Sequence, residues 1–247
     1  MGKIDRKSIK VLWVSLVKFP PLCEHLGETI PAHCGWMYSS AKALLRMMPE
    51  VRLGVMVYSY GRSYERYEID GVTYYLIPTG RIDRTSKKQI ETCRRAIRDF
   101  APDLMHIHGT EHSLAKAACV ANENGTRMVA NIQGLAGPYM RYADGGLSLW
   151  NKWTNITPLD FYRGTFLLNA KRNFKHRAEC ENYVLTYITD IVGRTQWDCD
   201  HVMTVNPRLR YHFMNETLRD SFYEVPRWNY AQCKKHTIFV SNSGSPL

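Results

Sequence analysis

The feature that most constrains this chain is a regular alternation of short β-prone apolar runs with longer segments of helical periodicity, which continues through residue 133. This alternation is typical of βαβ units, in which a helix connects two parallel strands. The strands of a parallel sheet are buried on both faces, and they are therefore nearly continuous apolar runs, as they are here. The pattern predicts an α/β protein with a mostly parallel sheet and helices on both faces.

The expected elements follow from these runs and from the residues that bound them. A hairpin is expected at 67–77, because two β-prone runs flank Asp70-Gly71. Ser86 and Gln89 have capping-box spacing at the start of a helix that Pro102 ends, and Thr195 and Asp198 form a capping box that begins a short helix. The segment 20–35 is rich in proline and glycine and is expected to be a loop. Further strands are expected at 9–14, 53–58, 104–108, 128–132, 191–193 and 221–225, and helices at 37–48 and 114–121.

Residues 135–190 differ from the rest, because they contain no convincing strand and combine a glycine-rich loop with a long helical stretch. Part of this stretch, residues 161–177, is basic and aromatic, with one helical stripe formed by Tyr162, Phe166, Ala170 and Phe174. Such a helix either packs its stripe on the core and exposes a solvated basic face, or lies on an anionic membrane surface.

The domain organisation is predicted from where the alternation stops. Residues 1–225 are expected to form one domain and 226–236 a linker, and 237–247 begin a new strand with no helix after it. A lone strand needs ladder partners and a covered face. Either the chain ends within a second domain, of which 237–247 is the first strand, or that strand adds to the first sheet.

The net charge of +10 narrows the possible partners without choosing one. An anionic partner of such a chain is a nucleic acid, a phosphorylated sugar carrier or the acidic inner face of a membrane. The alternative is a surface on which Lys and Arg are merely solvated. The sequence holds no zinc knuckle, no RRM-like aromatic motif and no basic heptad helix, so no nucleic-acid partner is expected.

The cysteines and the apolar runs bear on the compartment. The seven cysteines are scattered, odd in number and never spaced as C-x-x-C, which favours reduced thiols in the cytoplasm. No run approaches the roughly 20 apolar residues that span a bilayer. The run 11–17 ends at Lys18 and a Pro-Pro pair, and is therefore expected to be a buried strand instead of a signal peptide.

Ligands of an open parallel sheet bind beyond the carboxyl ends of the strands, near the point where the strand order reverses. This rule selects Gly35 and Trp36, at the start of the first long helix, where free N–H groups and the helix dipole can hold a phosphate. The alternative is that Gly35 only permits a left-handed turn. Neither G-x-G-x-x-G after a strand nor a G-x-x-x-x-G-K-[ST] loop is present, which argues against dehydrogenases and P-loop NTPases.

The segment 106–112 follows the strand at 104–108 and contains three histidines. His106, His108 and His112 can be drawn as a metal site, but no carboxylate or cysteine stands at a compelling ligand spacing. We therefore expect no metal, a core His106 with satisfied hydrogen bonds, and a His108 that faces the cleft and donates to a sugar or phosphate.

Two further strand ends carry polar side chains. Gln133 can donate and accept hydrogen bonds at once, which suits a sugar hydroxyl, but an amide is neither acid nor base near neutral pH. Arg194 is a permanently charged planar donor, and thus a candidate anion anchor. Each has a plainer alternative: Gln133 satisfies loop backbone, and Arg194 is an exposed surface residue.

A family resemblance connects these positions. The segment 101–111, Ala-Pro-Asp-Leu-Met-His-Ile-His-Gly-Thr-Glu, resembles the P-D-hydrophobic-hydrophobic-H-hydrophobic-H-G signature of family-4 retaining glycosyltransferases, especially bacterial surface-polysaccharide enzymes. Other stretches agree in order and spacing, so that the resemblance covers essentially the whole chain. These stretches are residues 10–15 with the loop to Gly35-Trp36, residues 131–135, and residues 193–198 followed by 215–219. Residues 237–241 look like the first strand of a second domain.

The resemblance implies a GT-B enzyme, in which two Rossmann-like domains face one cleft, the N-terminal domain holding the acceptor and the C-terminal one the nucleotide sugar. It implies transfer with retention to a saccharide or lipid-linked acceptor, without a cofactor or a metal. By this likeness Gly35 lies near the donor diphosphate. The other cleft-lining residues are Trp36, His108, Glu111, Gln133 and Arg194.

The sequence departs from the family pattern in two ways. Many relatives have a histidine where Gln133 stands, so no catalytic role is carried over to it. In the family, the paired-glutamate motif and the basic residues that bind the donor diphosphate belong to the second domain. This chain alone is therefore not expected to catalyse sugar transfer. The alternative function is a non-catalytic carbohydrate- or membrane-binding module. In either case we expect a cytoplasmic protein, with peripheral contact to an anionic inner membrane face.

Overall fold

The computed structural model describes residues 8–31, 34–80, 84–163 and 170–238. One eight-stranded sheet runs through it in the order β3-β4-β2-β1-β5-β6-β7-β8. Every neighbouring pair is parallel except β3 and β4, so the prediction of a mostly parallel α/β sheet is confirmed. The strands are β1 (Ile9–Ser15), β2 (Val51–Ser59), β3 (Glu65–Ile69), β4 (Val72–Pro78), β5 (Leu104–His108), β6 (Arg127–Asn131), β7 (Asp190–Gly193) and β8 (Arg210–Phe213).

The direction in which strands are added reverses between β1 and β5. The chain first builds outward from β1 through β2 to β4, and then returns to build on the other side from β5 to β8. This order is that of a doubly wound, Rossmann-type sheet, and the boundary between β1 and β5 is its topological switch point.

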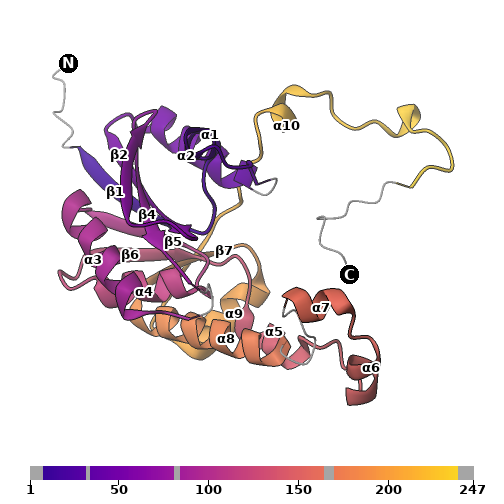
Figure 1. Ribbon diagram of the computed structural model, residues 1–247. Helices are drawn as coiled ribbons and strands as arrows, with labels where there is room; N and C mark the ends of the chain where they lie inside the picture. Colours follow the sequence, from indigo (N-terminus) through magenta and orange to yellow (C-terminus); the bar gives the residue numbers. More distant parts are fainter. Residues whose placement is uncertain (1–7, 32–33, 81–83, 164–169, 239–247) are drawn as a thin grey trace.

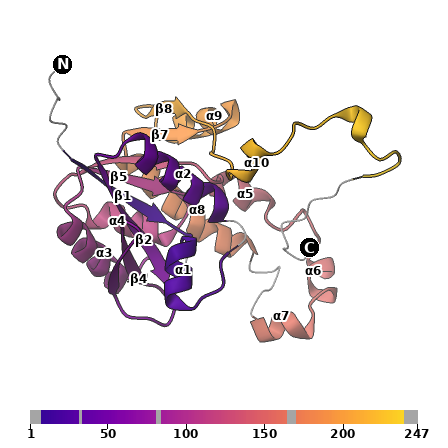
Figure 2. The ribbon, with the colours of Figure 1, turned by 90° about the horizontal axis from the view of Figure 1, so that it is seen from above.

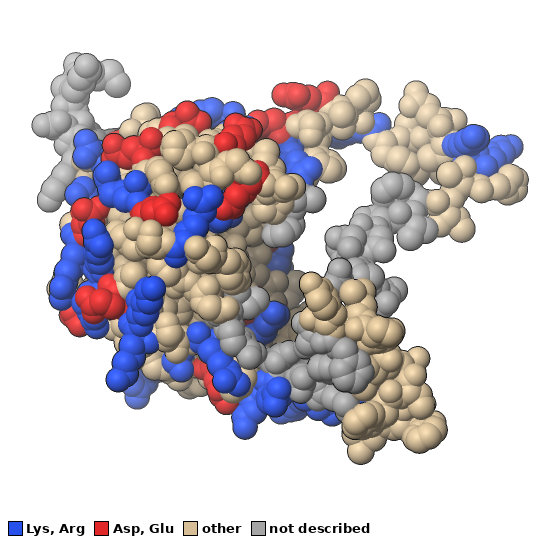
Figure 3. All heavy atoms as spheres, in the orientation of Figure 1, with Lys and Arg blue, Asp and Glu red and all other residues tan. Residues whose placement is uncertain are grey.

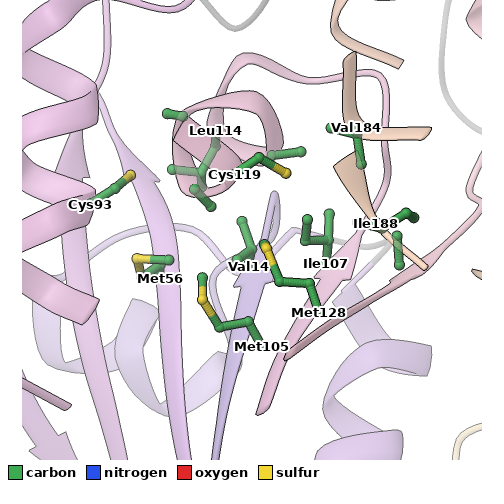
Figure 4. Close-up of a cluster of buried hydrophobic side chains, with 14 of the residues drawn as sticks. Val14, Met56, Cys93, Met105, Ile107, Leu114, Cys119, Met128, Val184 and Ile188 are labelled. Atoms are coloured by element: carbon green, nitrogen blue, oxygen red, sulfur yellow. The ribbon is translucent and has the colours of Figure 1, made fainter. Parts of the chain in front are cut away.

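Helices cover both faces of the sheet, as expected (Figures 1 and 2). Alternate residues of a strand point to opposite faces, so Leu12 and Val14 of β1 join one core and Val11 and Trp13 the other. The first core lies under α3 (Lys87–Phe100), α4 (Ser113–Ala121), α8 (Ala170–Tyr187) and α9 (Gln196–Val205), and Figure 4 shows part of it. The second lies under α1 (Pro20–Leu26) and α2 (Gly35–Met47).

Several local predictions are confirmed. The Ser86 hydroxyl accepts from the Gln89 N–H at 3.1 Å and caps α3, whereas the Gln89 side chain donates elsewhere, to Thr79. The capping box of α9 is complete, with Thr195 and Asp198 each accepting from the other's backbone N–H. Asp70 and Gly71 both have positive φ, as a tight turn between antiparallel β3 and β4 requires.

Two segments expected to be loops form helices. In 20–35 the proline pair begins α1, because proline is tolerated at the first helical positions, where its missing N–H needs no partner. Gly27 then ends α1 in the left-handed conformation. After Gln133 a second helix, α5 (Ala136–Tyr142), runs through Gly137, and the turn at Gly145 and Gly146 follows it.

The last strand is not where we expected it. Residues 221–225 do not join the sheet; Ser221–Glu224 form a short helix, α10, with exposed Phe222 and Tyr223. The strand beside β7 is instead β8, with Arg210 opposite Asp190. As an edge strand it is mostly exposed, and therefore it lacks the apolar run that marks the inner strands.

The basic aromatic stretch is not one described helix. Its beginning lies in α7 (Pro158–Arg163), which follows α6 (Leu149–Thr154), and its end lies in α8, while Phe166 falls outside the described residues. Beyond α10 the chain runs exposed through a 3-10 turn, η3 (Tyr230–Gln232). The linker at 226–236 and the strand at 237–247 stay predictions, since residues 239–247 also lie outside the described part.

Candidate functional site

The carboxyl ends of the central strands bring the predicted site residues to one edge. His108 at the end of β5 lies opposite Asn131 of β6, and Asn131 lies opposite Val192 of β7. Two backbone hydrogen bonds continue this alignment past the strands, from Gly109 N–H to Asn131 and from Ile132 N–H to Val192. The loops that follow β5, β6 and β7 are therefore neighbours, as a parallel sheet requires.

A largely apolar cavity of about 420 Å³ lies at the switch point, along β1 and β5. It is bounded on one side by α2 and on the other by residues 214–217, which follow β8. Two predicted site residues, Trp36 and His108, line it directly. The polar side chains in its wall, apart from the tryptophans, are Ser40, His106, His108, Asn131, Asn215, Glu216 and Thr217.

His106 and His108 stack in the wall of this cavity. Their ring centroids are 4.1 Å apart, and the indole of Trp13 lies 4.5 Å from His108. Burial lowers the pKa of His106 to about 4, and burial together with His106 holds the pKa of His108 well below its ordinary value. Both imidazoles are therefore neutral near pH 7, so each ring has one donor and one acceptor nitrogen.

Buried polar atoms without a partner among the described residues concentrate in the segment 106–112. They are Nε2 of His106, both nitrogens of His108, Oγ1 of Thr110, Oε2 of Glu111 and Nδ1 of His112. The expectation of a satisfied core His106 is therefore wrong. Because native proteins rarely leave buried polar groups unpaired, these atoms are placed to hydrogen-bond water or a ligand, and those of His106 and His108 do so from the cavity wall.

Glu111 and His112 form a pair just beyond β5. Nε2 of His112 lies 2.8 Å from a Glu111 oxygen, and both side chains are nearly buried. Burial alone would raise the pKa of Glu111, but the hydrogen bond from His112 and its electrostatic attraction outweigh burial, so this pKa lies below its ordinary value. A Cβ at Gly109 would contact Glu111, His112 and Gln133, which places these three side chains around one turn.

Gly35 is the first residue of α2 and does not have a positive φ, so it is no left-handed turn. A Cβ at this position would overlap the guanidinium of Arg219, which lies against the start of the helix. A larger residue at position 35 would therefore displace this guanidinium from the start of α2. Arg219 brings a cation to the helix terminus where an anion is expected to bind.

Gln133 and Arg194 reach the cavity only through other residues. Gln133 donates to the Asn131 side chain at 3.3 Å, and Asn131 lines the cavity. Arg194 pairs with Glu216 at 2.6 Å, and Glu216 lines the opposite wall. The structure therefore groups all six predicted residues around one edge, with Trp36 and His108 in the cavity and the others around it.

This arrangement favours recognition of a neutral polyhydroxyl group beside an aromatic wall. Neutral imidazoles and amides both donate and accept, as a sugar hydroxyl does, and indoles cover apolar ring faces. Within the described ranges no group of three His, Cys, Asp or Glu side chains is arranged to hold a metal ion. Sequence patterns had not indicated Trp13, whose only signal is its place two residues before the end of β1.

The fold and this edge define a doubly wound, Rossmann-type α/β domain with a cavity at its switch point. No protein-family model matches the chain, and no curated protein matches it. Across the described part of the chain, no helix is both long and apolar enough to cross a bilayer.

Among solved structures, the chain is similar to sucrose-phosphate synthase from Thermosynechococcus elongatus, with 7% identity and a TM-score of 0.44 over 83% of this chain and 47% of that one. It is also similar to UDP-GlcNAc 2-epimerase from Neisseria meningitidis, bound to UDP-GlcNAc, with 12% identity and a TM-score of 0.41 over 79% and 43%. A trehalose-6-phosphate synthase matches with 10% identity and a TM-score of 0.39 over 82% and 48%. The chain spans about half the length of each.

Proposed function

We propose that this chain is the acceptor-side domain of a GT-B glycosyltransferase, which transfers a sugar with retention from a nucleotide sugar to a saccharide or lipid-linked acceptor. The observation that carries the proposal is His108, whose two buried nitrogens have no partner among the described residues and which lines the cavity at the switch point. The motif at 101–111 that resembles family-4 glycosyltransferases ends on this histidine and the adjoining turn.

In this proposal each residue around the cavity has a distinct role in binding the acceptor. The neutral imidazole of His108 and the amides of Asn131 and Gln133 hydrogen-bond acceptor hydroxyl groups, and Trp36 covers an apolar face of the acceptor. Glu111 fixes His112 beside them. No metal or cofactor is required by this set of side chains, and the domain is expected to be inactive without its donor-binding partner domain.

The donor diphosphate is proposed to lie at the start of α2. The first N–H groups of a helix have no partner within the helix. α2 begins at Gly35, and the Arg219 guanidinium lies against this residue. Arg194 lies on the other side of the cavity, where its partner Glu216 holds it. A cytoplasmic location gives access to nucleotide sugars, and peripheral contact with an anionic membrane gives access to a lipid-linked acceptor.

The proposal is tested with the whole reading frame that contains this chain. The measurement is release of nucleoside diphosphate from a panel of nucleotide sugars, with NMR assignment of the product anomer. We expect His108→Ala and Arg194→Ala to lower kcat/KM by about tenfold or more, because each removes a hydrogen bond that water cannot replace in a closed site. Both variants are expected to stay folded in thermal unfolding, with His108→Ala the less stable of the two because it removes a buried ring.

Control variants change the same residue types at positions away from the site. His25 and Arg98 are exposed and lie away from the cavity, so His25→Ala and Arg98→Ala are expected to keep the wild-type rate. Equal rates for all four variants would refute the site. A whole protein that releases no nucleoside diphosphate from any donor, yet binds saccharides, would favour the non-catalytic module instead.

A further inference from the structure

Helices α6 and α7 carry a set of apolar side chains that face solvent. Figures 1 and 2 both show these helices apart from the sheet and from the helices that cover it. The exposed fractions are 75% for Trp150, 64% for Trp153 and 90% for Tyr162. We call this set the aromatic arm; its residues are Leu147, Leu149, Trp150, Trp153, Leu159 and Tyr162.

A basic cluster lies at the base of the aromatic arm. Arg141, Lys171, Arg172 and Lys175 line a shallow depression beside Met140, between the end of α5 and the start of α8. Over residues 136–177 the sequence holds seven Lys and Arg against two Asp. In Figure 3 the end of the molecule that carries α6 and α7 is largely uncharged, and Lys and Arg lie where this end joins the domain.

One buried carboxylate ties the arm to the cluster. Oδ2 of Asp144 lies 2.6 Å from Nζ of Lys152 in α6 and 3.0 Å from Nζ of Lys171 in α8. These two hydrogen bonds hold the pKa of Asp144 well below its ordinary value, so it stays ionised and both contacts persist at neutral pH. The apolar and basic surfaces are therefore held next to each other.

The composition of the combined surface selects one kind of partner. Exposed apolar patches in this concentration mark interaction sites. Trp and Tyr are enriched where apolar chains meet headgroups, since one end of each ring is apolar and the other can hydrogen-bond. Stable attachment to a bilayer needs two signals, such as inserted apolar groups and basic residues facing anionic headgroups.

We propose that the aromatic arm inserts into the headgroup region of an anionic lipid bilayer while Arg141, Arg172 and Lys175 contact lipid phosphates. This surface differs from the single basic helix that the sequence had suggested, because the inserted aromatic side chains come from α6 and α7. It rests on the membrane contact of the proposed function and names the surface that makes this contact. Vesicle binding is measured without a donor, so its failure leaves sugar transfer to a soluble acceptor unaffected.

The experiment measures partition of the chain into vesicles of phosphatidylcholine with phosphatidylglycerol, and into phosphatidylcholine alone, by co-sedimentation. The double variant Trp150→Ala/Trp153→Ala is expected to partition about tenfold more weakly, because two interfacial side chains are lost. Brominated phosphatidylcholine is expected to quench tryptophan fluorescence in the wild type and much less in this variant. Arg172→Gln/Lys175→Gln is expected to weaken binding about tenfold to the anionic vesicles alone.

The matched control removes two tryptophans of equal exposure elsewhere. Trp197 is 63% exposed in α9 and Trp228 is 77% exposed near η3, so Trp197→Ala/Trp228→Ala is expected to bind vesicles as the wild type does. Far-UV circular dichroism and thermal unfolding report whether each variant folds. Equal partition of Trp150→Ala/Trp153→Ala and Trp197→Ala/Trp228→Ala, or no binding of the wild type to anionic vesicles, would overturn the proposal. Self-association that Trp150→Ala/Trp153→Ala abolishes, without vesicle binding, would assign the arm to a second copy and would also overturn it.

Discussion

At the scale of single residues, the buried histidines make the stability of this domain depend on pH. His106 has a pKa of about 4 in the folded protein and about 6.5 in an unfolded chain, because burial disfavours its charged form. Between these values the unfolded state binds more protons, so the free energy of unfolding falls as pH drops from 6.5 towards 4. At roughly 1.4 kcal/mol per pKa unit, the contribution of His106 to this loss is on the order of 3 kcal/mol.

The variant His106→Gln cannot take up this proton, and we expect its urea stability to fall less between pH 7 and pH 4.5 than that of the wild type. The pKa of His108 is also lowered, so protonation of His108 destabilises the domain at low pH as well. His108 is still present in the variant, and part of the pH dependence therefore remains. The comparison variant His25→Gln changes an exposed ring and is expected to keep the wild-type slope. A His106→Gln slope as steep as that of the wild type would contradict a neutral, buried His106.

At the scale of elements, a buried carboxylate positions the segment that follows β6. Glu181 of α8 is fully buried and accepts from the N–H groups of Ala136 and Gly137, at 2.8 and 3.0 Å. His201 lies 3.2 Å from the same carboxylate. Negative charge at a helix N-terminus is favourable, so Glu181 both caps α5 and stabilises it.

We expect Glu181→Gln to destabilise the domain by about 1–2 kcal/mol, because an amide has one accepting oxygen and leaves a buried donor unpaired. Amide hydrogen exchange at Ala136 and Gly137 is expected to accelerate as well. Glu179→Gln, two residues earlier on the same helix, changes a side chain that is 53% exposed, and it is expected to cost little in urea denaturation. Equal stability of the two variants would show that Glu181 does not hold α5.

The strands differ in how well the sequence predicted them. The inner strand β5 was predicted to the residue and β1, β2, β6 and β7 to within two residues at each end, because burial on both faces leaves an apolar run between turn residues. The edge strand β8 was missed, since its mostly exposed residues carry no such run, and 221–225 was chosen instead on local β-propensity. The site residues at the ends of β5, β6 and β7 follow from the parallel order, whereas the links through Asn131 and Glu216 depend on side-chain conformations that no pattern contains.

At the scale of the whole molecule, the edge strand β8 controls the wall of the cavity, because residues 214–217 follow it directly. Asp190 of β7 fixes β8 in place. Its buried carboxylate lies 2.7 Å from Arg210 and 3.0 Å from His212, both in β8, and 3.3 Å from Arg127 in β6. Burial opposes ionisation of Asp190, but these partners outweigh burial and lower its pKa, so this stabilisation is present above about pH 3.8 and is lost below it.

We expect Asp190→Asn to destabilise the domain by about 2 kcal/mol at pH 7, less than a fully buried ion pair would, because both arginines remain largely hydrated. The loss is expected to spread from β8 to the cavity wall, so that amide hydrogen exchange accelerates at Tyr211 and His212 and then at Met214, whose N–H donates to the Gly193 carbonyl, while β1 and β5 exchange as before. Asp200→Asn, at an exposed position in α9, is the matched control and is expected to leave exchange unchanged. If exchange at Met214 stayed slow while β8 opened, the cavity wall would be held by Arg194 and not by the sheet.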